Sequence, residues 1–367
     1  MLMNERLNDN GKTALRLALP SDGELHEPTL SFLRNCGIPV LRPSARRYTA
    51  HIPALPGVEV LFQRTADITQ KVEEGSAEMG VTGLDRYLEY RNDENRVVTL
   101  IDDLHFGRCD LVLAVPDSWL DVASVDDLAD LALEFRQEGK QLRIATKYPR
   151  LLRRYLFDRD INYFTLVPVS GTLEAAPAAG YADLIADLSA TGTTLRENGL
   201  KTLESGTILG SQACLIGNPA LLTASRQSLS QSRALMEMME GHLRAEPFYR
   251  LTANVRGTSP EEVSSMILAR PDLAGLRGPT LARVYNVAEE DWYSVSLLVR
   301  KDRLLEAVDH LRDSGGVDIS ASQVNYLFSS HSSAYRRLEA IRSQLSADRG
   351  VAQYSAIPPT KGRGEGG

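Results

Sequence analysis

The segment that most constrains the fold of this chain is residues 174–200, where a short apolar run leads into a loop of small hydroxyl residues. The run 184–188, Leu-Ile-Ala-Asp-Leu, predicts a buried strand. Asp183 and Asp187 are separated by an even number of positions, so on a strand they point to the same side, and we expect both acids near its carboxyl end. The alternative for Asp183 is that it only fixes the loop through backbone hydrogen bonds. In an open α/β sheet, that end is where ligands bind.

A phosphate-binding loop is expected directly after this strand. The hydroxyls of Thr191, Thr193 and Thr194 are its candidate donors, and Gly192 allows a close approach of the backbone. Asp187 precedes the loop and can accept hydrogen bonds from the hydroxyls of a sugar. Phosphate donors and an acid at one strand end therefore predict a site for a sugar phosphate activated at its anomeric carbon. The alternative is a strand that ends in an ordinary Ser/Thr/Gly turn.

The same segment closely resembles the signature of the ATP phosphoribosyltransferases, the enzymes of the first step of histidine biosynthesis. Further segments that carry the resemblance are Leu15–Pro20, Phe62–Ile68, Met79–Asp85, Phe106–Cys109 and Ile144–Pro149. The chain is most similar to the long, plant-type variant of this family. The resemblance implies transfer of the phosphoribosyl group of phosphoribosyl pyrophosphate to N1 of ATP, with Mg²⁺, giving phosphoribosyl-ATP and pyrophosphate.

By this resemblance, Asp187 and Glu174 are the catalytic residues. The residues implied for binding phosphoribosyl pyrophosphate are Asp187, Leu188, Ser189, Ala190, Thr191, Gly192, Thr193 and Thr194. Those implied for ATP are Ser21, Gly23, Arg64, Gly83, Asp85 and Arg108, with Lys147 as a further cation by position. The reaction needs no covalent nucleophile, because N1 attacks the anomeric carbon as pyrophosphate leaves. Positioning and electrostatics are therefore expected to supply most of the rate enhancement.

One loop departs from the family pattern. Where the family usually carries Ser-Lys-Gly-Arg, residues 21–24 are Ser-Asp-Gly-Glu, so anions replace cations where ATP phosphates would lie. Either Mg²⁺ bridges these groups, or Arg16, Arg46 or Arg47 substitutes for the missing cations. The departure motivates an alternative, a catalytically impaired paralogue that acts as a ligand-binding regulatory subunit. A two-lobed solute-binding protein is a second alternative, because it shares the expected architecture.

The composition indicates a folded protein that does not bind nucleic acid. Of 367 residues, 43% are hydrophobic and 24% are charged, and the formal net charge of −7 argues against a basic nucleic-acid-binding face. No run reaches the length of a membrane span, and residues 1–12 lack the apolar core of a secretory signal, so we expect a cytoplasmic protein with no membrane partner. Cys36, Cys109 and Cys214 show no metal-ligand spacing and are expected to be buried, reduced thiols.

Strand-like and helical runs alternate along the first two thirds of the chain, which is typical of βαβ units and of the α/β class. We expect two catalytic lobes arranged as in periplasmic binding proteins, followed by a regulatory domain. The expected segments are 1–115 with a return segment 195–225 for lobe I, 116–194 for lobe II, 226–248 for a linking helix, 249–330 for the regulatory domain, and 331–367 for a C-terminal helix and disordered tail.

The region 249–330 predicts a ferredoxin-like domain with the order βαββαβ. The expected elements are strand 251–255, helix 259–268, strands 280–284 and 292–299, helix 301–314 and strand 319–328. By resemblance this is an ACT-like domain that binds histidine and causes feedback inhibition, with the effector residues Leu276, Gly278, Pro279 and Thr280. The alternative is an assembly module without a ligand. The resemblance also implies a homo-oligomer, in which dimers assemble into a hexamer.

Overall fold

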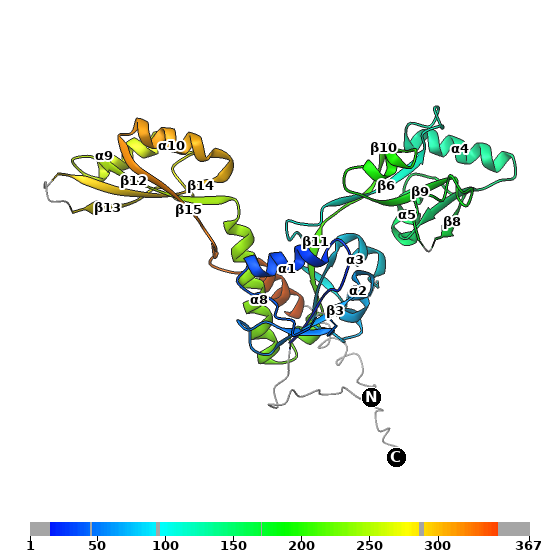
Figure 1. The fold of residues 1–367 in the computed structure, drawn as a ribbon, viewed down its shortest axis with the longest axis horizontal. Coiled ribbons are helices and arrows are strands. Elements are labelled where there is room, and N and C mark those ends of the chain that lie inside the picture. Colours follow the sequence, from blue (N-terminus) through cyan, green and yellow to red (C-terminus); the bar gives the residue numbers. More distant parts are fainter. Residues whose placement is uncertain (1–14, 45, 93–95, 170, 286–289, 344–367) are drawn as a thin grey trace, which may run out of the picture. The chain divides into compact units, whose positions relative to one another are not determined.

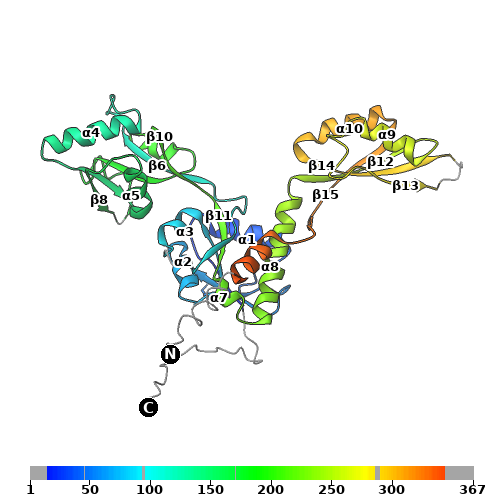
Figure 2. The ribbon, with the colours of Figure 1, turned by 180° about the vertical axis from the view of Figure 1, so that it is seen from behind.

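The computed structural model describes residues 15–44, 46–92, 96–169, 171–285 and 290–343. They form two compact units (Figures 1 and 2). The first contains the described residues up to Leu235 and those from Ser333 onward, and the second spans Met236–Ser332. Within the described part of the chain, no helix is both long enough and apolar enough to cross a membrane.

The first unit begins with a mixed sheet built around parallel strands. Its strands, in spatial order, are β2 (Thr49–His51), β3 (Val58–Gln63), β1 (Leu15–Pro20), β4 (Met79–Gly83), β11 (Ala213–Gly217) and β5 (Val98–Ile101). Strands β3, β1 and β4 are parallel, whereas β2 and β11 pair in the antiparallel sense. Strands β1 and β4 are almost continuously buried, as expected for central strands of a sheet. Their sequences therefore do not alternate between apolar and polar residues.

Helices cover this sheet and close its core. They are α1 (His26–Asn35), α2 (Thr65–Glu73), α3 (Leu84–Tyr90), α7 (Pro219–Leu222) and α8 (Arg226–Ala245). Ile68 and Val72 of α2 pack with Tyr87 of α3 and Cys214 of β11 in one buried cluster. Helix α8 contains the boundary between the two units.

A second sheet of the same unit contains the strand expected in the segment 174–200. Its strands, in spatial order, are β10 (Leu200–Ser211), β6 (Cys109–Pro116), β9 (Leu184–Ser189), β7 (Leu142–Thr146) and β8 (Phe164–Pro168). Its helices are α4 (Val125–Gln137), α5 (Pro149–Phe157) and α6 (Thr193–Glu197). Ser124 is the N-cap of α4, where Ser124 and Asp127 form a reciprocal capping box.

Two short connections carry the chain between the sheets. The chain passes from β5 to β6 between Ile101 and Cys109, and returns from β10 to β11 between Ser211 and Ala213. Strands β6 and β10 pair with each other (Figure 1). In this pairing Ser211 lies opposite Cys109. The second sheet therefore includes residues 109–115 and 200–211, which the sequence division assigned to lobe I and its return segment. The α/β fold with mixed sheets agrees with the expected class, and the division at 115 and 194 stays a prediction.

The second unit is a sheet with two helices in the order βαββαβ. Its elements are β12 (Phe248–Arg256), α9 (Pro260–Leu268), β13 (Thr280–Val284), β14 (Trp292–Arg300), a short 3-10 turn (Lys301–Arg303), α10 (Leu304–Asp313) and β15 (Gly316–Gln323). The strand order β13-β14-β12-β15, antiparallel throughout, is ferredoxin-like, as predicted. Alternate residues of β14, such as Val295 and Leu297, are buried under the helices.

One strand of this unit ends earlier than predicted. The expected strand 319–328 corresponds to β15, Gly316–Gln323. This strand ends at Gln323 because Gln323 pairs with Tyr249, and only Phe248 of β12 lies beyond that pair. The chain beyond it packs on α8 instead. The amide of Leu327 donates to the carbonyl of Gly241 at 2.8 Å, and a Cβ at Gly241 would lie 2.7 Å from the ring of Phe328.

Candidate functional site

The predicted phosphate loop is a tight turn between β9 and α6. Gly192 is the N-cap of α6 and has a φ of +72°, in the left-handed region that favours glycine. Its amide donates to the Oγ of Ser189 at 2.9 Å. The side chains of Thr191, Thr193 and Thr194 are exposed at this turn. The loop thus presents hydroxyl groups to solvent at the carboxyl end of a strand.

A cation that the sequence analysis missed also lies at this loop. Arg196 donates through Nη2 to the carbonyl of Thr191 at 3.3 Å and to Oγ1 of Thr193 at 3.2 Å. A Cβ on Gly192 would lie 2.9 Å from its Nη1. The sequence signal that could have identified Arg196 is its spacing from Thr193, because residues three positions apart on a helix lie on the same side.

The structure brings Asp187, Glu174 and Lys147 together at the end of β9. Burial is the main cause that raises the pKa of the Asp187 carboxyl above its ordinary value. The amide of Leu188, which donates to Oδ1 at 2.9 Å, and the cation of Lys147 oppose this rise in pKa, whereas the Glu174 carboxylate adds to it. Arg86 of α3 is a further cation that lowers the pKa of Asp187. Asp187 is therefore a half-buried acid among groups of both signs.

Asp183 does not lie with Asp187. The expectation that both acids sit near the carboxyl end of the strand is wrong, because β9 begins at Leu184 and Asp183 precedes it. Its carboxylate accepts hydrogen bonds from the amide and from Nη2 of Arg143 on β7, each at 2.7 Å. Asp183 fixes the beginning of β9 to its neighbour.

The ATP residues predicted in the first loops gather at one edge of the first sheet. Ser21 follows β1 and its amide donates to the carbonyl of Gln63, directly before Arg64, at 2.7 Å. Gly83 ends β4, the parallel strand on the other side of β1. Because the carboxyl ends of parallel strands meet at one edge, Ser21, Arg64 and Gly83 share it. Gly23 has a φ of +76° and is exposed.

The cations available near this edge differ from the expected ones. Arg16 is paired with Glu78 and also donates to the carbonyl of Gly75 at 2.8 Å, so its charge is already matched. Arg108 is exposed and donates to Asp103 at 2.6 Å. Arg42, which was not considered, lies with its guanidinium carbon 4.2 Å from the ring centre of Phe62 on β3.

Asp85 is buried behind the same edge. It is 4% exposed, and its Oδ1 and Oδ2 accept hydrogen bonds from Ser211 at 2.7 Å and from Tyr148 at 2.8 Å. A Cβ on Gly83 would lie 2.2 Å from Oδ1, so glycine is required there to leave room for the carboxylate. The predicted contact of Asp85 with ATP stays a prediction. Of the cysteines, Cys36 and Cys214 are buried as predicted, whereas Cys109 is only half-buried.

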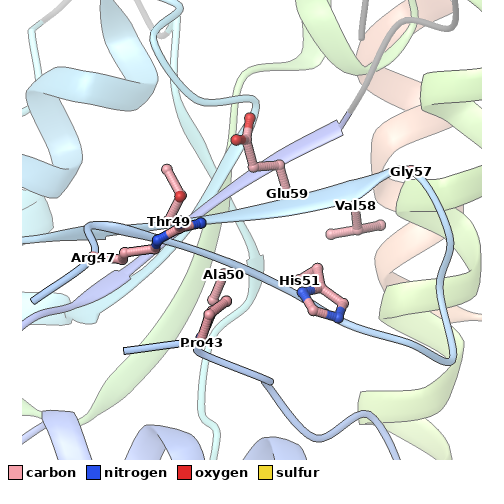
Figure 3. A pocket seen from close by; sticks show the side chains of 8 residues that line it. All are labelled: Pro43, Arg47, Thr49, Ala50, His51, Gly57, Val58 and Glu59. Atoms are coloured by element: carbon pink, nitrogen blue, oxygen red, sulfur yellow. The ribbon is translucent and has the colours of Figure 1, made fainter. Parts of the chain in front are cut away.

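A hollow elsewhere on the first sheet does not contain these residues (Figure 3). It is lined by Pro43, Arg47, Thr49, Ala50, His51, Gly57, Val58 and Glu59 around the edge strand β2. Its volume of about 280 Å³ is at the lower limit of ligand pockets, roughly 300–1,000 Å³. Arg47, one of the expected substitute cations, lines this hollow. It lies two residues before Thr49, which pairs with Leu61 in the antiparallel sense, so its backbone is near the carboxyl end of β3.

In the second unit, the predicted effector residues form the loop that leads into β13. Leu276 is 53% exposed, and Thr280 is the first residue of β13 and is exposed. Gly278 has a φ of +96°, and a Cβ added there would have no atom within 4 Å among the described residues. The glycine is therefore required by the backbone conformation, and the space beside it is open.

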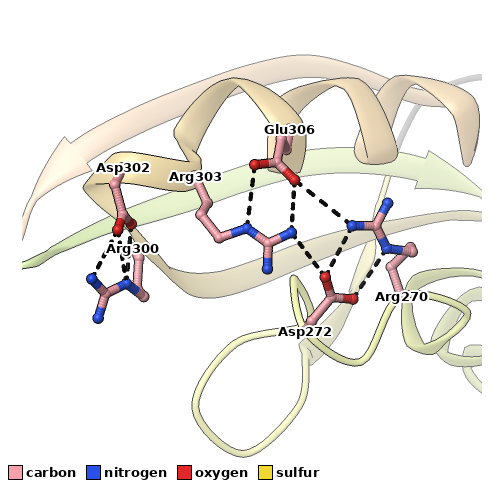
Figure 4. Close-up of polar contacts among 6 residues, drawn as sticks. All are labelled: Arg270, Asp272, Arg300, Asp302, Arg303 and Glu306. Atoms are coloured by element: carbon pink, nitrogen blue, oxygen red, sulfur yellow. Dashed lines mark hydrogen bonds and ion pairs between the residues drawn. The ribbon is translucent and has the colours of Figure 1, made fainter.

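An ion-pair network holds the start of the same loop (Figure 4). Asp272 Oδ2 accepts from Arg270 and from Arg303, each at 2.9 Å, and Arg303 also donates to Glu306 at 2.6 Å. The hydrogen bond from Arg270, and then that from Arg303, lower the pKa of the Asp272 carboxyl far below its ordinary value. The network ties the segment after α9 to the beginning of α10.

Comparison with known proteins places these observations in a family. A profile of ATP phosphoribosyltransferases matches residues 64–241, and a profile of the HisG C-terminal domain matches residues 245–326. The chain is 37% identical over 324 residues to ATP phosphoribosyltransferase 2, chloroplastic, of Arabidopsis thaliana, which covers 87% of this chain and 78% of that protein. It is 32% identical over 332 residues to the ATP phosphoribosyltransferase of Nitrobacter hamburgensis, covering 89% of this chain and 98% of that protein.

Among solved structures, the ATP phosphoribosyl transferase (HisG:HisZ) complex from Thermotoga maritima is similar over 62% of this chain and 98% of that chain, with 26% identity and a TM-score of 0.48. The sequence relationships cover the catalytic region and the C-terminal region alike. The chain belongs to the ATP phosphoribosyltransferase family.

Proposed function

We propose that this chain transfers the phosphoribosyl group of phosphoribosyl pyrophosphate to N1 of ATP, giving phosphoribosyl-ATP and pyrophosphate, the first step of histidine biosynthesis. The observation that carries the proposal is the turn from Ser189 to Thr194, with exposed threonine hydroxyls, a left-handed Gly192 and the half-buried Asp187 directly before it. Membership of the family supports the reaction type.

The loop would hold the sugar phosphate. The hydroxyls of Thr191, Thr193 and Thr194, together with loop amides, donate to the 5′-phosphate, and Arg196 adds a positive charge beside it. Asp187 accepts from the ribose hydroxyls, and its negative charge stabilises the cationic character that develops on the ribose as pyrophosphate departs. Glu174 assists from the neighbouring turn.

ATP would bind at the edge where β3, β1 and β4 end. The proposed contacts are Ser21, Gly23, Arg64, Gly83, Asp85 and Arg108, as expected from the sequence. N1 of the adenine uses its lone pair to form the bond to the anomeric carbon while the bond to pyrophosphate breaks, and the pyrophosphate leaves with the electron pair. Fixing both substrates in line for this exchange is the main task of the protein.

Mg²⁺ is the proposed cofactor, and it would neutralise the pyrophosphate that leaves. Among the described residues, no group of three or more His, Cys, Asp or Glu side chains is placed to hold a metal ion. In sites of this kind the ion commonly takes one or two carboxylates and completes its shell with phosphate oxygens and water. Asp187 and Glu174 are oxygen donors of the required hard type and lie close enough for the charge of Glu174 to affect Asp187.

We further propose that histidine is an effector that binds at Leu276, Gly278, Pro279 and Thr280, and that the chain assembles as a homo-oligomer of dimers up to a hexamer. The left-handed Gly278 and the exposed Thr280 support the effector site. A reducing, cytoplasmic location is also proposed, and the free thiols of the buried Cys36 and Cys214 support it.

A turnover assay tests the reaction. Purified protein is incubated with ATP, phosphoribosyl pyrophosphate and Mg²⁺, and phosphoribosyl-ATP is measured with and without histidine, with Asp187→Asn as the control for background. The second candidate is a catalytically impaired regulatory paralogue, which the exposed Asp22 and Glu24 at the ATP edge favour. Binding of the substrates without any product would select the paralogue.

A further inference from the structure

Helix α3 carries two buried carboxylates one turn apart. Asp85 and Glu89 are 4% and 6% exposed. Positions i and i+4 lie on one face of a helix, so both side chains point the same way. Both reach the turn Tyr148–Leu151, which begins α5 beside the second sheet. Buried carboxylates need such specific partners, because an unpaired buried charge is strongly destabilising.

Glu89 supplies the N-terminal cap that α5 lacks in its own sequence. The N-cap residue Tyr148 makes no capping hydrogen bond with its side chain, and Pro149 has no backbone N–H. The amides of Arg150 and Leu151 instead donate to Oε1 and Oε2 of Glu89, each at 2.9 Å. A carboxylate is also favoured there by the helix dipole. Because Glu89 belongs to α3, the cap joins a helix of the first sheet to a helix of the second.

Asp85 begins a chain of hydrogen bonds that ends beside Asp187. The hydroxyl of Tyr148 donates to Asp85 Oδ2 at 2.8 Å, and the amide of Tyr148 donates to Oγ1 of Thr146 at 3.0 Å. The Thr146 hydroxyl donates in turn to the carbonyl of Ala186 at 2.9 Å. Ala186 directly precedes Asp187 on β9. The position of the Asp187 backbone is thus connected to α3 through three consecutive contacts.

The Asp85 end of this chain is itself held firmly. Ser211 donates to Oδ1 at 2.7 Å and accepts from the amide of Asp85 at 3.0 Å. The guanidinium of Arg86 lies 3.7 Å from Asp85 Oδ2 and 4.6 Å from the centre of the Tyr148 ring. Ser211 ends β10 of the second sheet, directly before the connection to β11 of the first sheet, so the carboxylate is fixed where the chain passes between the sheets.

We infer that Asp85, Glu89 and Tyr148 form a latch between α3 and α5 that sets the position of Asp187 relative to the ATP edge of the first sheet. Glu89 and Tyr148 are positioning residues, Asp85 anchors Tyr148 in addition to its proposed contact with ATP, and the inference rests on the proposed function. Gly83 and α3 belong to the ATP edge, whereas the latched turn supports β9 on the phosphoribosyl side. Because a small misplacement of reacting groups slows the reaction more than it weakens binding, losing the latch should lower kcat with little change in KM.

Tyr148→Phe tests the latch with a close control. The substitution removes only the hydroxyl that reaches Asp85, and Tyr87→Phe removes a matched hydroxyl from α3 itself, since buried Tyr87 donates to the carbonyl of Val97 at 2.8 Å. We expect a similar fall in Tm for both variants. Only Tyr148→Phe should lower kcat for phosphoribosyl-ATP formation, by about tenfold, with KM for both substrates within about twofold.

Glu89→Gln gives a second and independent probe. The substitution replaces one carboxylate oxygen with an amide NH₂, which cannot accept the hydrogen bond of the backbone N–H that faces it at the start of α5. Hydrogen exchange at Arg150 or Leu151 should therefore become faster, and kcat should fall. Asp127→Asn is the control, because Asp127 caps only its own helix, α4. That variant should affect stability and leave kcat unchanged.

The outcomes distinguish the proposed function from the latch. Wild-type protein that forms no phosphoribosyl-ATP overturns the proposed function and the inference together. Active wild type, with Tyr148→Phe and Glu89→Gln no slower than their controls, overturns the latch alone. A rise in KM without a fall in kcat also overturns it, because that pattern would make the residues binding contacts.

Discussion

The guanidinium of Arg337 donates to both carboxylate oxygens of Asp102, each at 2.8 Å. Arg337 lies in the helix 333–343, and Asp102 directly follows β5 at the edge of the first sheet. A hydrogen bond at 2.9 Å to the carbonyl of Thr99 reinforces the contact. The chain therefore returns to the first unit after the ferredoxin-like unit, and this pair attaches it there.

Arg337→Met should cost at most about 1 kcal/mol of unfolding free energy, since the pair is largely solvated. The hydrogen bond from Arg337 lowers the pKa of the Asp102 carboxyl in the folded state, so the stabilisation is present above the unfolded pKa of about 4 and disappears as the pH falls through the lower folded value. Thermal unfolding at neutral and at acidic pH measures the difference. Arg154→Met, which removes the more exposed pair with Asp158, is the control. An equal effect of Arg337→Met at both pH values would contradict the assignment.

Asp187→Asn should separate stability from activity. Burial raises the pKa of Asp187, so the folded protein binds a proton at this site more readily than the unfolded chain does. The ionised group therefore lowers stability above a pH of about 4, the unfolded value, and most fully above the raised folded pKa. Asparagine removes this cost in unfolding free energy, and its side-chain oxygen can still accept the hydrogen bond from the amide of Leu188. We expect an unchanged or higher Tm at pH 7, together with a loss of turnover larger than the loss of binding. Full activity would remove Asp187 from the mechanism.

Thr194→Ala should weaken binding of phosphoribosyl pyrophosphate. A hydrogen bond to a charged phosphate is worth about 1.5–3 kcal/mol, so the Kd should rise by roughly ten- to a hundredfold. Titration calorimetry measures it directly. Thr202→Ala removes an exposed hydroxyl from β10 of the same sheet, outside the loop, and should leave the Kd unchanged. If both variants bind alike, the loop does not hold the phosphate.

The double variant Asp22→Lys, Glu24→Arg should tighten ATP binding, because it restores positive charge at the edge where β1 ends. Glu27→Lys, at an exposed position on α1, controls for net charge. Cys109 reports on the local charge: burial, and to a smaller extent Asp85 and Glu24, raise its thiol pKa to about 11. The thiol should thus be alkylated faster in the double variant. Faster alkylation with weaker ATP binding would mean that the acidic loop suits its ligand.

The strand, the loop and the ferredoxin-like order could be predicted because their signals are local. An apolar run followed by a glycine turn specifies β9 and its loop, and Thr280–Val284 of β13 has the predicted bounds. The partner of Asp183, Arg143, could not be predicted, because it depends on which residue of β7 lies beside the start of β9. Register between strands distant in the sequence leaves no local pattern.

Helix α5 shows the same limit for helices. A cap is normally read from Ser, Thr, Asp or Asn at the first position, whereas α5 begins with Tyr148 and Pro149. Its cap is Glu89, sixty-one positions from Arg150 along the chain. The network around Asp85 is equally distant in sequence, with Ser211 as a partner. The sequence indicated Asp85 as a site residue, but its partners Ser211 and Tyr148, and the role of Glu89, could be found only in the tertiary structure.

Thr280→Ala tests feedback by histidine in the intact chain. Thr280 is exposed at the start of the edge strand β13, next to the left-handed Gly278, and its hydroxyl can donate to the carboxylate of an amino acid. The variant should keep the uninhibited rate and the oligomeric state, while the histidine concentration for half inhibition should rise by roughly tenfold or more, as expected for one lost bond to a charged group. Ser320→Ala, at an exposed site on β15 at the other edge of the sheet, should be inhibited by histidine at the same concentration as the wild type. A wild type indifferent to millimolar histidine, or identical inhibition curves for Thr280→Ala and Ser320→Ala, would leave this unit as an assembly module, because the loop before β13 would then carry no effector.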